Sequence, residues 1–341
     1  MSGQHPPRAL HIPQTIRTLL EQGAHLLINV SGGKDSDTML KLLWEAYVEH
    51  NWQGDFRVVT CDLQRNEWPF SLPHIHRFVS DTTGKQVEVI RREQGDLLDQ
   101  WWTRYRTLQD EGRAERVPPW SSAAARFCTK AQKESQVNKF IVKHYPRDSI
   151  IMSCIGIRAD ESVARKNKHV VQAYTKSPTA PTKNRHVYRW LPIHEFSLSD
   201  VWSTLGWTLE RLEALRAEVK ATVQPGDVKK LHAVLDRWGY TANPVYALGN
   251  DRCSCRMCVL ANQNDLLNGI LWNPDHYRDL VELELTSGFS FQQGRFLADI
   301  RPELLTEDQR ERRARLRQTP EVRPTVTAKP TTLPVQMALP W

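Results

Sequence analysis

Residues 25–30 (HLLINV) form a continuous apolar run that leads directly into Ser-Gly-Gly-Lys-Asp-Ser at residues 31–36. Such a run is typical of a strand buried on both faces of a parallel sheet. Residues 35–49 then carry apolar side chains at helical spacing, so the glycine pair lies in a strand-to-helix turn. Two glycines let the backbone approach an anion, and the helix start offers free N–H groups. The segment therefore predicts a phosphate-binding loop.

Hydroxyl and charged side chains strengthen this interpretation of the loop. Ser31 and Ser36 can donate hydrogen bonds to an anion, and Lys34 adds a positive charge beside a phosphate pair. The spacing is not that of a Walker A loop, which has four residues between its first glycine and Gly-Lys-Ser/Thr, nor that of the dinucleotide fingerprint. The alternative is a glycine-rich turn that binds nothing.

Strands alternate with helices along the first half of the chain, which predicts an α/β fold with a parallel sheet flanked by helices. Ligands of such sheets bind at the carboxyl ends of the strands. Further strands are expected at residues 56–61, 86–90, 149–155 and 187–191, and further helices at 72–79, 130–144, 199–205, 208–218 and 226–238. Three parts are expected: a nucleotide-binding domain at 1–220, a smaller, mostly helical C-terminal part at 221–308, and a flexible basic tail at 309–341.

The net charge is +7, from 46 Lys and Arg against 39 Asp and Glu, but it is unevenly distributed. Residues 163–194 hold seven basic residues and no acidic one, and residues 309–341 hold seven basic and two acidic ones. The rest of the chain is therefore net acidic. We expect the first segment to meet phosphates near the nucleotide, and both segments are candidates for binding nucleic acid.

The sequence has no apolar run long enough to cross a membrane, and its first residues lack the apolar core of a secretory signal. We therefore expect a cytoplasmic protein without a membrane partner. Its six cysteines are too few and too unevenly spaced for a disulfide scaffold. Cys253, Cys255 and Cys258 crowd into one short segment, which favours metal binding or redox work. Cys61 and Cys154 lie in expected strands and are interpreted as core residues.

Residues 31–36 resemble the PP-loop of the adenine-nucleotide α-hydrolase superfamily, whose fold is the HUP type. Later motifs resemble its phosphoadenosine-phosphosulfate (PAPS) reductase-like family, and the resemblance covers about residues 20–270. These motifs are Asp62 with Glu67 and Pro69, Cys128-Thr129 with Lys133, Gly156-Ile157-Arg158 with Glu161, Ser162 and Arg165, Pro192-Ile193, Asp200-Val201-Trp202, and Asn243-Pro244 with Cys255 and Cys258.

The resemblance implies roles for individual residues around an adenine nucleotide, ATP or PAPS. Asp62 would lie near the adenine or ribose, and Lys34, Asp35 and Arg158 would carry the catalytic step. Asp35 can alternatively cap the helix that follows the loop. The implied nucleotide-binding residues are Ser31, Gly32, Gly33, Lys34, Asp35, Ser36, Asp62, Gly156, Arg158 and Arg165.

The resemblance also adds Cys128 to the cysteine cluster, because the family often has a cluster ligand there. Four thiolates, from Cys128, Cys253, Cys255 and Cys258, fit either a [4Fe–4S] cluster or tetrahedral zinc. The family favours iron–sulfur. If Cys253 is a spectator, three thiolates leave one open coordination position. Reduced thiols without any metal are the remaining alternative.

PAPS reductases carry a catalytic cysteine near the C-terminus, and residues 259–341 contain none. The intact loop suits ATP cleavage to AMP and pyrophosphate better, with Mg²⁺ on the phosphates, to activate a substrate for sulfur transfer. These features resemble most the sulfur-transfer proteins of DNA phosphorothioation, which implies nucleic acid as an acceptor and a cysteine desulfurase as a sulfur donor. The alternatives are a PAPS or adenylylsulfate reductase and a non-catalytic regulatory partner that binds a nucleotide.

Overall fold

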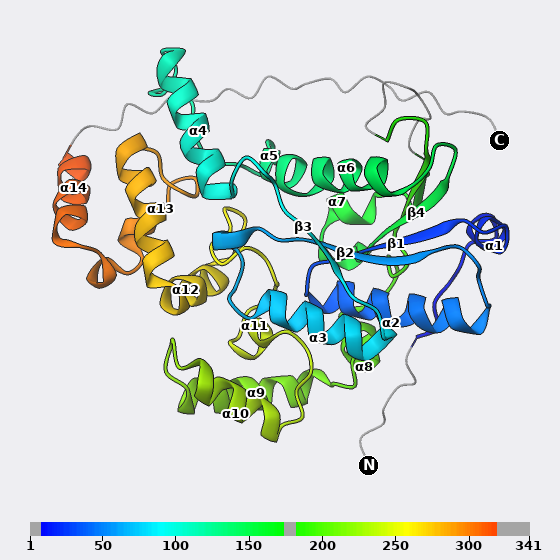
Figure 1. Ribbon diagram of the computed structural model, residues 1–341. Coiled ribbons are helices and arrows are strands. Elements are labelled where there is room, and N and C mark those ends of the chain that lie inside the picture. The colour runs from blue at the N-terminus through cyan, green and yellow to red at the C-terminus, as the bar shows by residue number, and fades with distance from the viewer. Residues whose placement is uncertain (1–7, 174–181, 319–341) are drawn as a thin grey trace.

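The computed structural model describes residues 8–173 and 182–318 and contains a six-stranded sheet in the order β3-β2-β1-β4-β6-β5 (Figure 1). Its strands pair in parallel except β5, which runs antiparallel to β6 at one edge. The expected α/β fold with a parallel sheet is thus confirmed. The strands are β1 (His25–Val30), β2 (Phe56–Cys61), β3 (Glu88–Ile90), β4 (Ile150–Ile155), β5 (Val171–Ala173) and β6 (His186–Trp190).

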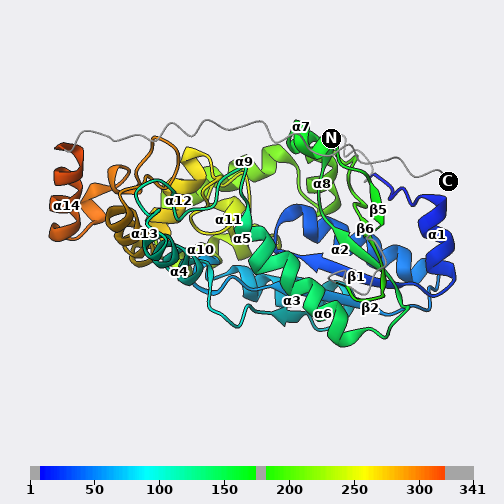
Figure 2. The ribbon, with the colours of Figure 1, turned by 90° about the horizontal axis from the view of Figure 1, so that it is seen from above.

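Helices cover both faces of this sheet and continue beyond it on one side, as Figure 1 and Figure 2 show. The strands and helices expected from periodicity are all present, with ends shifted by a few residues. The helices are α1 (Gln14–Glu21), α2 (Lys34–Glu49), α3 (Ser71–Thr83), α4 (Leu97–Asp110), α5 (Phe127–Thr129), α6 (Ser135–His144), α7 (Val163–Lys166), α8 (Leu198–Thr204), α9 (Leu209–Thr222), α10 (Val228–Arg237), α11 (Pro244–Ala247), α12 (Gln263–Trp272), α13 (Pro274–Ser287) and α14 (Glu307–Gln318).

Strand β1 shows why the apolar run needs both faces covered. Leu26 and Ile28 pack into the cluster that contains the apolar face of α2, whereas Leu27 packs into a second cluster with Phe140 and Ile141 of α6. The two layers lie on opposite sides of the sheet, with α2, α3 and α8 below it and α6 above it in Figure 1. Leu26, Leu27 and Ile28 are each at most 1% exposed, so apolar side chains on both faces of β1 are buried in the core.

Strand order reverses between β1 and β4, which places the turn after β1 at a topological switch point. Strands β2 and β3 extend the sheet on one side of β1, and β4 and β6 extend it on the other. Open α/β sheets bind ligands at this point, outside the carboxyl ends of the strands. The loop at residues 31–36 therefore lies where the fold itself favours a ligand.

The C-terminal helices share their packing with the sheet domain. One buried cluster joins Trp68 and Phe70, which follow β2, to apolar residues of α9, α10 and α11. Another joins Leu98 and Trp101 of α4 to α12 and α13. The expected boundary at 220/221 falls inside α9, which runs to Thr222, and α4 was not expected from the sequence.

The segment expected to be a basic tail begins as a helix. Helix α14 extends to Gln318, and residues 319–341 lie outside the described residues. Three of its five arginines form ion pairs: Arg312 with Glu282, and Arg313 and Arg317 with Asp299, at 2.7 Å in each case. These arginines therefore fix α14 to the body.

The basic segment at 163–194 is also partly used within the fold. Arg185 is 8% exposed and donates hydrogen bonds to the carbonyl oxygens of Tyr145 and Val142, at 2.7–2.9 Å. Arg189 lies 3.6 Å from Glu134. Of its lysines, Lys176 lies outside the described residues, whereas Lys166 and Lys168 are exposed.

Within the described residues, the helices are too short or too polar to span a membrane.

The segment that carries the cysteine cluster is fixed by close backbone packing against α12. A Cβ at Gly269 would lie 1.8 Å from the carbonyl oxygen of Arg256, so this helix position requires glycine. Gly84 ends α3 with a φ of +67°, but a Cβ there would meet nothing within 4 Å.

We expect Gly269→Ala to lower the free energy of unfolding by on the order of 3 kcal/mol, because α12 must move away from the cysteine segment. Gly84→Ala should cost only about 1 kcal/mol, the strain of a left-handed alanine. Urea unfolding of both variants checks this order. Equal losses would contradict the packing described here.

Candidate nucleotide and thiol site

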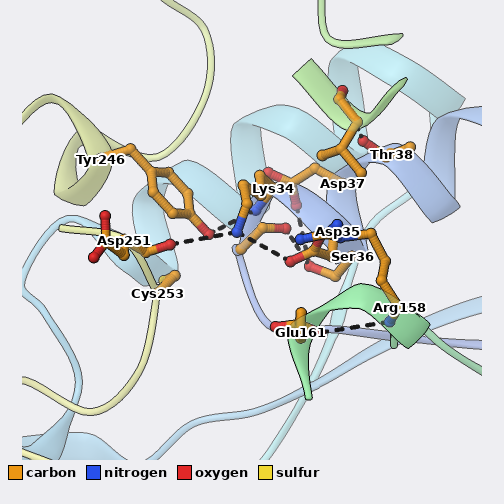
Figure 3. A network of polar contacts seen from close by, with 12 residues as sticks. Lys34, Asp35, Ser36, Asp37, Thr38, Arg158, Glu161, Tyr246, Asp251 and Cys253 are labelled. Atoms are coloured by element: carbon orange, nitrogen blue, oxygen red, sulfur yellow. Dashed lines mark hydrogen bonds and ion pairs between the residues drawn. The ribbon is translucent and has the colours of Figure 1, made fainter. Parts of the chain in front are cut away.

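The PP-loop is shaped by its own serines and glycines (Figure 3). The hydroxyl of Ser36 accepts a hydrogen bond from the Ser31 amide at 3.1 Å and donates one to the Gly33 carbonyl at 2.8 Å. Gly32 has a φ of +67°, and a Cβ there would lie 2.9 Å from the Ile75 side chain. Gly33 precedes α2 without a side-chain cap. Gly33 therefore provides no side-chain acceptor for the first amides of the helix, which suits a site for an anion.

Lys34 is buried at the start of α2, with 4% of its surface exposed. Its ammonium group lies 3.3 Å from the Asp35 carboxylate and 3.4 Å from the carbonyl oxygen of Asp251. Its backbone amide donates to the Tyr246 hydroxyl at 3.0 Å, and burial raises the pKa of that hydroxyl well above its usual value. A neutral Tyr246 from α11 thus joins the C-terminal part to the loop (Figure 3).

Arg158 reaches the same carboxylate from the segment after β4. Its Nε lies 2.5 Å from Asp35 Oδ1, and its Nη1 lies 2.5 Å from Asp160. The side chain is almost fully buried, so these carboxylates balance its charge. A Cβ at Gly156 would lie 2.8 Å from the Asp35 carbonyl oxygen, which explains the glycine. Arg158 contacts the loop through Asp35, and its predicted contact with phosphates remains a prediction.

Two further predicted nucleotide ligands, Arg165 and Asp62, lie on segments other than the loop. Arg165 pairs with Glu161 four residues earlier, and burial followed by repulsion from Arg252 lowers its pKa. Asp62 follows β2 and accepts hydrogen bonds from Arg91 at 2.7 Å and from the Gln64 amide at 2.8 Å. Both predicted nucleotide ligands therefore already have partners within the protein.

Sequence reasoning missed the structural role of His74, which stabilises the loop through Asp37 and Ser36. Its Nε2 lies 2.8 Å from Asp37 Oδ2, and both side chains are at most 3% exposed. Asp37 Oδ1 in turn lies 3.3 Å from the Ser36 hydroxyl, so the histidine is linked to the loop through two residues. The partners are 37 positions apart, and no local pattern joins them.

The four predicted metal ligands do not gather as one group. Cys253 lies against the PP-loop. Its Sγ is 4.0 Å from the Ser31 carbonyl oxygen and 3.6 Å from Nδ2, the side-chain amide nitrogen of Asn243. A Cβ on Gly33 would lie 3.3 Å from the Cys253 Cβ. Cys253 thus lies against the PP-loop, apart from its neighbour Cys255 in its contacts.

Cys128, Cys255 and Cys258 are near one another. Burial raises the pKa of Cys255 well above its usual value, and the neighbouring thiols Cys258 and Cys128 raise it further. Burial also raises the pKa of Cys258, partly offset by the Leu260 amide, whose nitrogen lies 3.4 Å from its sulfur. Such soft donors suit iron or zinc. In this conformation, however, no group of three or more His, Cys, Asp or Glu residues in the described parts is arranged to hold a metal ion.

Glu67 and Lys133 are buried charged residues that influence these thiols. Burial raises the pKa of Glu67 to about 7, although the charge of Lys133 opposes the shift. The pKa of Lys133 is raised, because Glu67 and the thiols Cys255, Cys61 and Cys253 outweigh its burial. The sequence indicated both residues only as parts of family motifs, and the structure adds that each acts on the charge of the other and on that of Cys253.

We expect His74→Leu to lower the free energy of unfolding by about 3 kcal/mol, because Asp37 would stay buried without its partner. His74→Gln is the matched control, since its terminal amide nitrogen can take the place of Nε2. It should lose less than about half as much. Urea unfolding measures both, and equal losses would show that the bond to Asp37 contributes little.

The fold agrees with the comparison with known protein families. The model of the phosphoadenosine phosphosulfate reductase domain matches residues 25–215, from β1 into α9. No curated protein matches the chain significantly. The match covers more than half of the sequence and contains the PP-loop, Asp62, Glu67, Lys133 and Arg158. The chain therefore belongs to the phosphoadenosine phosphosulfate reductase domain family, whose members use nucleotide substrates.

Proposed function

We propose that the chain binds ATP on the PP-loop and cleaves it to AMP and pyrophosphate, activating a substrate for sulfur transfer. The observation that carries this proposal is the loop: Gly33 provides no side-chain cap for α2, only the Lys34 amide is bonded to the Tyr246 hydroxyl in its place, and the Lys34 side chain lies at that helix end. A helix start with a lysine can hold the phosphates and offset the charge that develops on pyrophosphate as it leaves.

The reaction has two steps. A substrate oxygen attacks the α-phosphorus, the bond to the β-phosphate oxygen breaks, and pyrophosphate leaves. A sulfur nucleophile then displaces AMP from the adenylated substrate. Mg²⁺, when bound with ATP, supplies further charge neutralisation at the phosphates. Lys34 and the loop amides act on the first step, and Asp35 with Arg158 holds Lys34 in place.

The three thiols of Cys128, Cys255 and Cys258 support a metal role in the same reaction. Their donor chemistry fits a [4Fe–4S] cluster or zinc, and the charges of Cys258, Cys128, Glu67 and Lys133 all act on the Cys255 thiol. Bound there, an iron–sulfur cluster would supply a coordination position for inorganic sulfide. A persulfide-bearing protein such as a cysteine desulfurase is the sulfur donor that fits this proposal, together with a two-electron thiol reductant that releases its outer sulfur as sulfide.

Cys253 favours a second candidate function, reduction of a sulfonucleotide such as PAPS. Its thiol lies against the PP-loop, at the place where a nucleotide phosphate or sulfate would bind. It could replace the cysteine that residues 259–341 lack. Binding of PAPS in preference to ATP, with release of sulfite and no pyrophosphate, would favour this second function over the first.

We expect Ser36→Ala to reduce ATP affinity about tenfold or more, because the loop loses two hydrogen bonds worth about 1 kcal/mol each. Ser80→Ala, on the exposed face of α3, is the matched control. ATP binding and pyrophosphate release with Mg²⁺ are measured for both variants. Unchanged ATP binding by Ser36→Ala would refute the loop assignment.

We expect anaerobically purified protein to be brown and to contain iron and acid-labile sulfide. Serine variants of Cys128, Cys255 and Cys258 should lose most of this iron, whereas Cys253→Ser should retain it, because Cys253 lies apart at the loop. Metal analysis of the four variants tests this. A colourless protein with stoichiometric zinc would overturn the iron–sulfur assignment, and equal loss in Cys253→Ser would overturn the separation of the thiols.

A further inference from the structure

The PP-loop is covered by a second segment of the chain, residues 243–253, which we name the loop cover. Gly32, Gly33 and Lys34 are all buried. A Cβ on Gly33 would lie 3.2 Å from the Tyr246 hydroxyl of the loop cover. In Figure 3 the Tyr246 side chain points toward Lys34 at the start of α2. A polyphosphate therefore reaches the buried part of the loop only if the loop cover moves.

Two contacts of the loop cover use the hydrogen-bond donors that a phosphate would use. The Tyr246 hydroxyl accepts from the Lys34 backbone amide at 3.0 Å. The carbonyl oxygen of Asp251 lies 3.4 Å from the Lys34 ammonium group. In both contacts the loop cover supplies an oxygen to a donor at the start of the helix, where an anion binds. The loop cover thus takes the place of two phosphate oxygens.

The first residue of the loop cover makes a contact for which a phosphate does not compete. Asn243 is fully buried, and its Nδ2 donates to the Gly32 carbonyl oxygen at 2.9 Å. An ionised phosphate offers acceptors, so it cannot replace a donor to a carbonyl oxygen. Asn243 therefore anchors one end of the loop cover, whereas the contacts of Tyr246 and Asp251 are the ones that an anion displaces.

The exchange of these two contacts for phosphate oxygens is favourable. Burial raises the pKa of the Tyr246 hydroxyl well above its usual value, so this acceptor is neutral. Hydrogen bonds to an ionised acceptor are roughly twice as strong as those to a neutral one. The contact between the Lys34 ammonium group and Asp251 is long for a hydrogen bond, at 3.4 Å. A polyphosphate therefore displaces the loop cover, whereas neutral water gains nothing by doing so.

Arg216 of α9 holds the loop cover from outside the PP-loop. Its Nε donates to the Tyr246 carbonyl oxygen at 2.8 Å, and its Nη2 donates to the Asn250 carbonyl oxygen at 2.7 Å. Glu213 fixes the same guanidinium at 2.7 Å. These bonds stabilise the covered position without using any donor of the loop. Arg216 thus offers a way to weaken the loop cover without changing the phosphate site.

We propose that the loop cover is an autoinhibitory element whose Tyr246 hydroxyl and Asp251 carbonyl oxygen occupy the PP-loop until a polyphosphate displaces them. The inference rests on the proposed binding of ATP to this loop. Opening also moves Cys253, the last residue of the loop cover, away from the Ser31 carbonyl oxygen. Binding of ATP is thereby coupled to the position of a thiol at the loop.

The first test compares Tyr246→Phe with Tyr240→Phe. Tyr240 is also buried, and its hydroxyl donates to the Asn243 carbonyl oxygen at 3.2 Å, so each change removes one buried hydrogen bond. Calorimetry measures binding of the non-cleavable α,β-methylene analogue of ATP to the full chain. Tyr246→Phe should bind it about fivefold more tightly, because one competing hydrogen bond is lost. Tyr240→Phe should resemble the wild type. Unchanged or weaker binding by Tyr246→Phe would overturn the proposal, and weaker binding would show that the hydroxyl donates to the nucleotide.

A second pair of variants tests the same element from outside the loop. Arg216→Gln should also bind the analogue about fivefold more tightly, since the covered position loses its bonds to α9. Arg211→Gln is the matched control, because Arg211 lies on the same helix and donates to the Trp238 carbonyl oxygen at 2.7 Å. It should bind like the wild type. Equal affinities of the two variants would contradict autoinhibition.

Hydrogen exchange of the wild-type protein reports the movement itself. Backbone amides within residues 244–253 should exchange faster when the analogue binds, although a bound ligand ordinarily slows exchange around its site. Slower or unchanged exchange in this segment would overturn the proposal and leave ATP binding standing. Failure of the wild type to bind the analogue at all would instead contradict the proposed function, and the autoinhibitory role with it.

Discussion

The ion pairs of Asp35 connect the parts on which the site depends. This carboxylate lies between Lys34 of the PP-loop and Arg158 of the segment after β4, and both cations are at most 4% exposed. Removing such charges from water costs several kcal/mol per ion unless each has a partner. The ends of β1 and β4 are therefore joined by charge at the switch point of the sheet, and the close approach at Gly156 permits this.

The central unit of the fold could be predicted because its signals are local. The apolar run at 25–30, the glycine pair and the helical spacing after it are neighbours in sequence, and they form β1, the loop and α2 as expected. Features that depend on distant contacts could not be predicted. Tyr246 meets the Lys34 amide across 212 positions, and His74 meets Asp37 across 37, without any periodicity that links the partners.

The cysteines show the same limit within a single motif. Cys253 and Cys255 are two positions apart, and spacing alone assigns both to one metal site. In the structure Cys253 meets the Ser31 carbonyl oxygen, whereas Cys255 lies with Cys258 and Cys128. The Arg256 amide bonds to the Asn66 carbonyl oxygen at 2.9 Å, which fixes the segment after β2 against the cysteine segment. Contacts from distant segments thus give the thiols different surroundings, and with them different chemistry.

Charge counted along the sequence is similarly a poor guide to where an anion binds. The basic segment at 163–194 contains Arg185, whose donors are used by backbone carbonyls, and three arginines of α14 are paired with acidic side chains. Helix α4 has equal numbers of acidic and basic residues, but its helical period places them on different faces. Asp99 pairs with Arg65 on one side, whereas Arg104 turns to Phe127 with a donor left unpaired. A cation that already has a partner within the protein therefore contributes less to anion binding than its count in the sequence suggests.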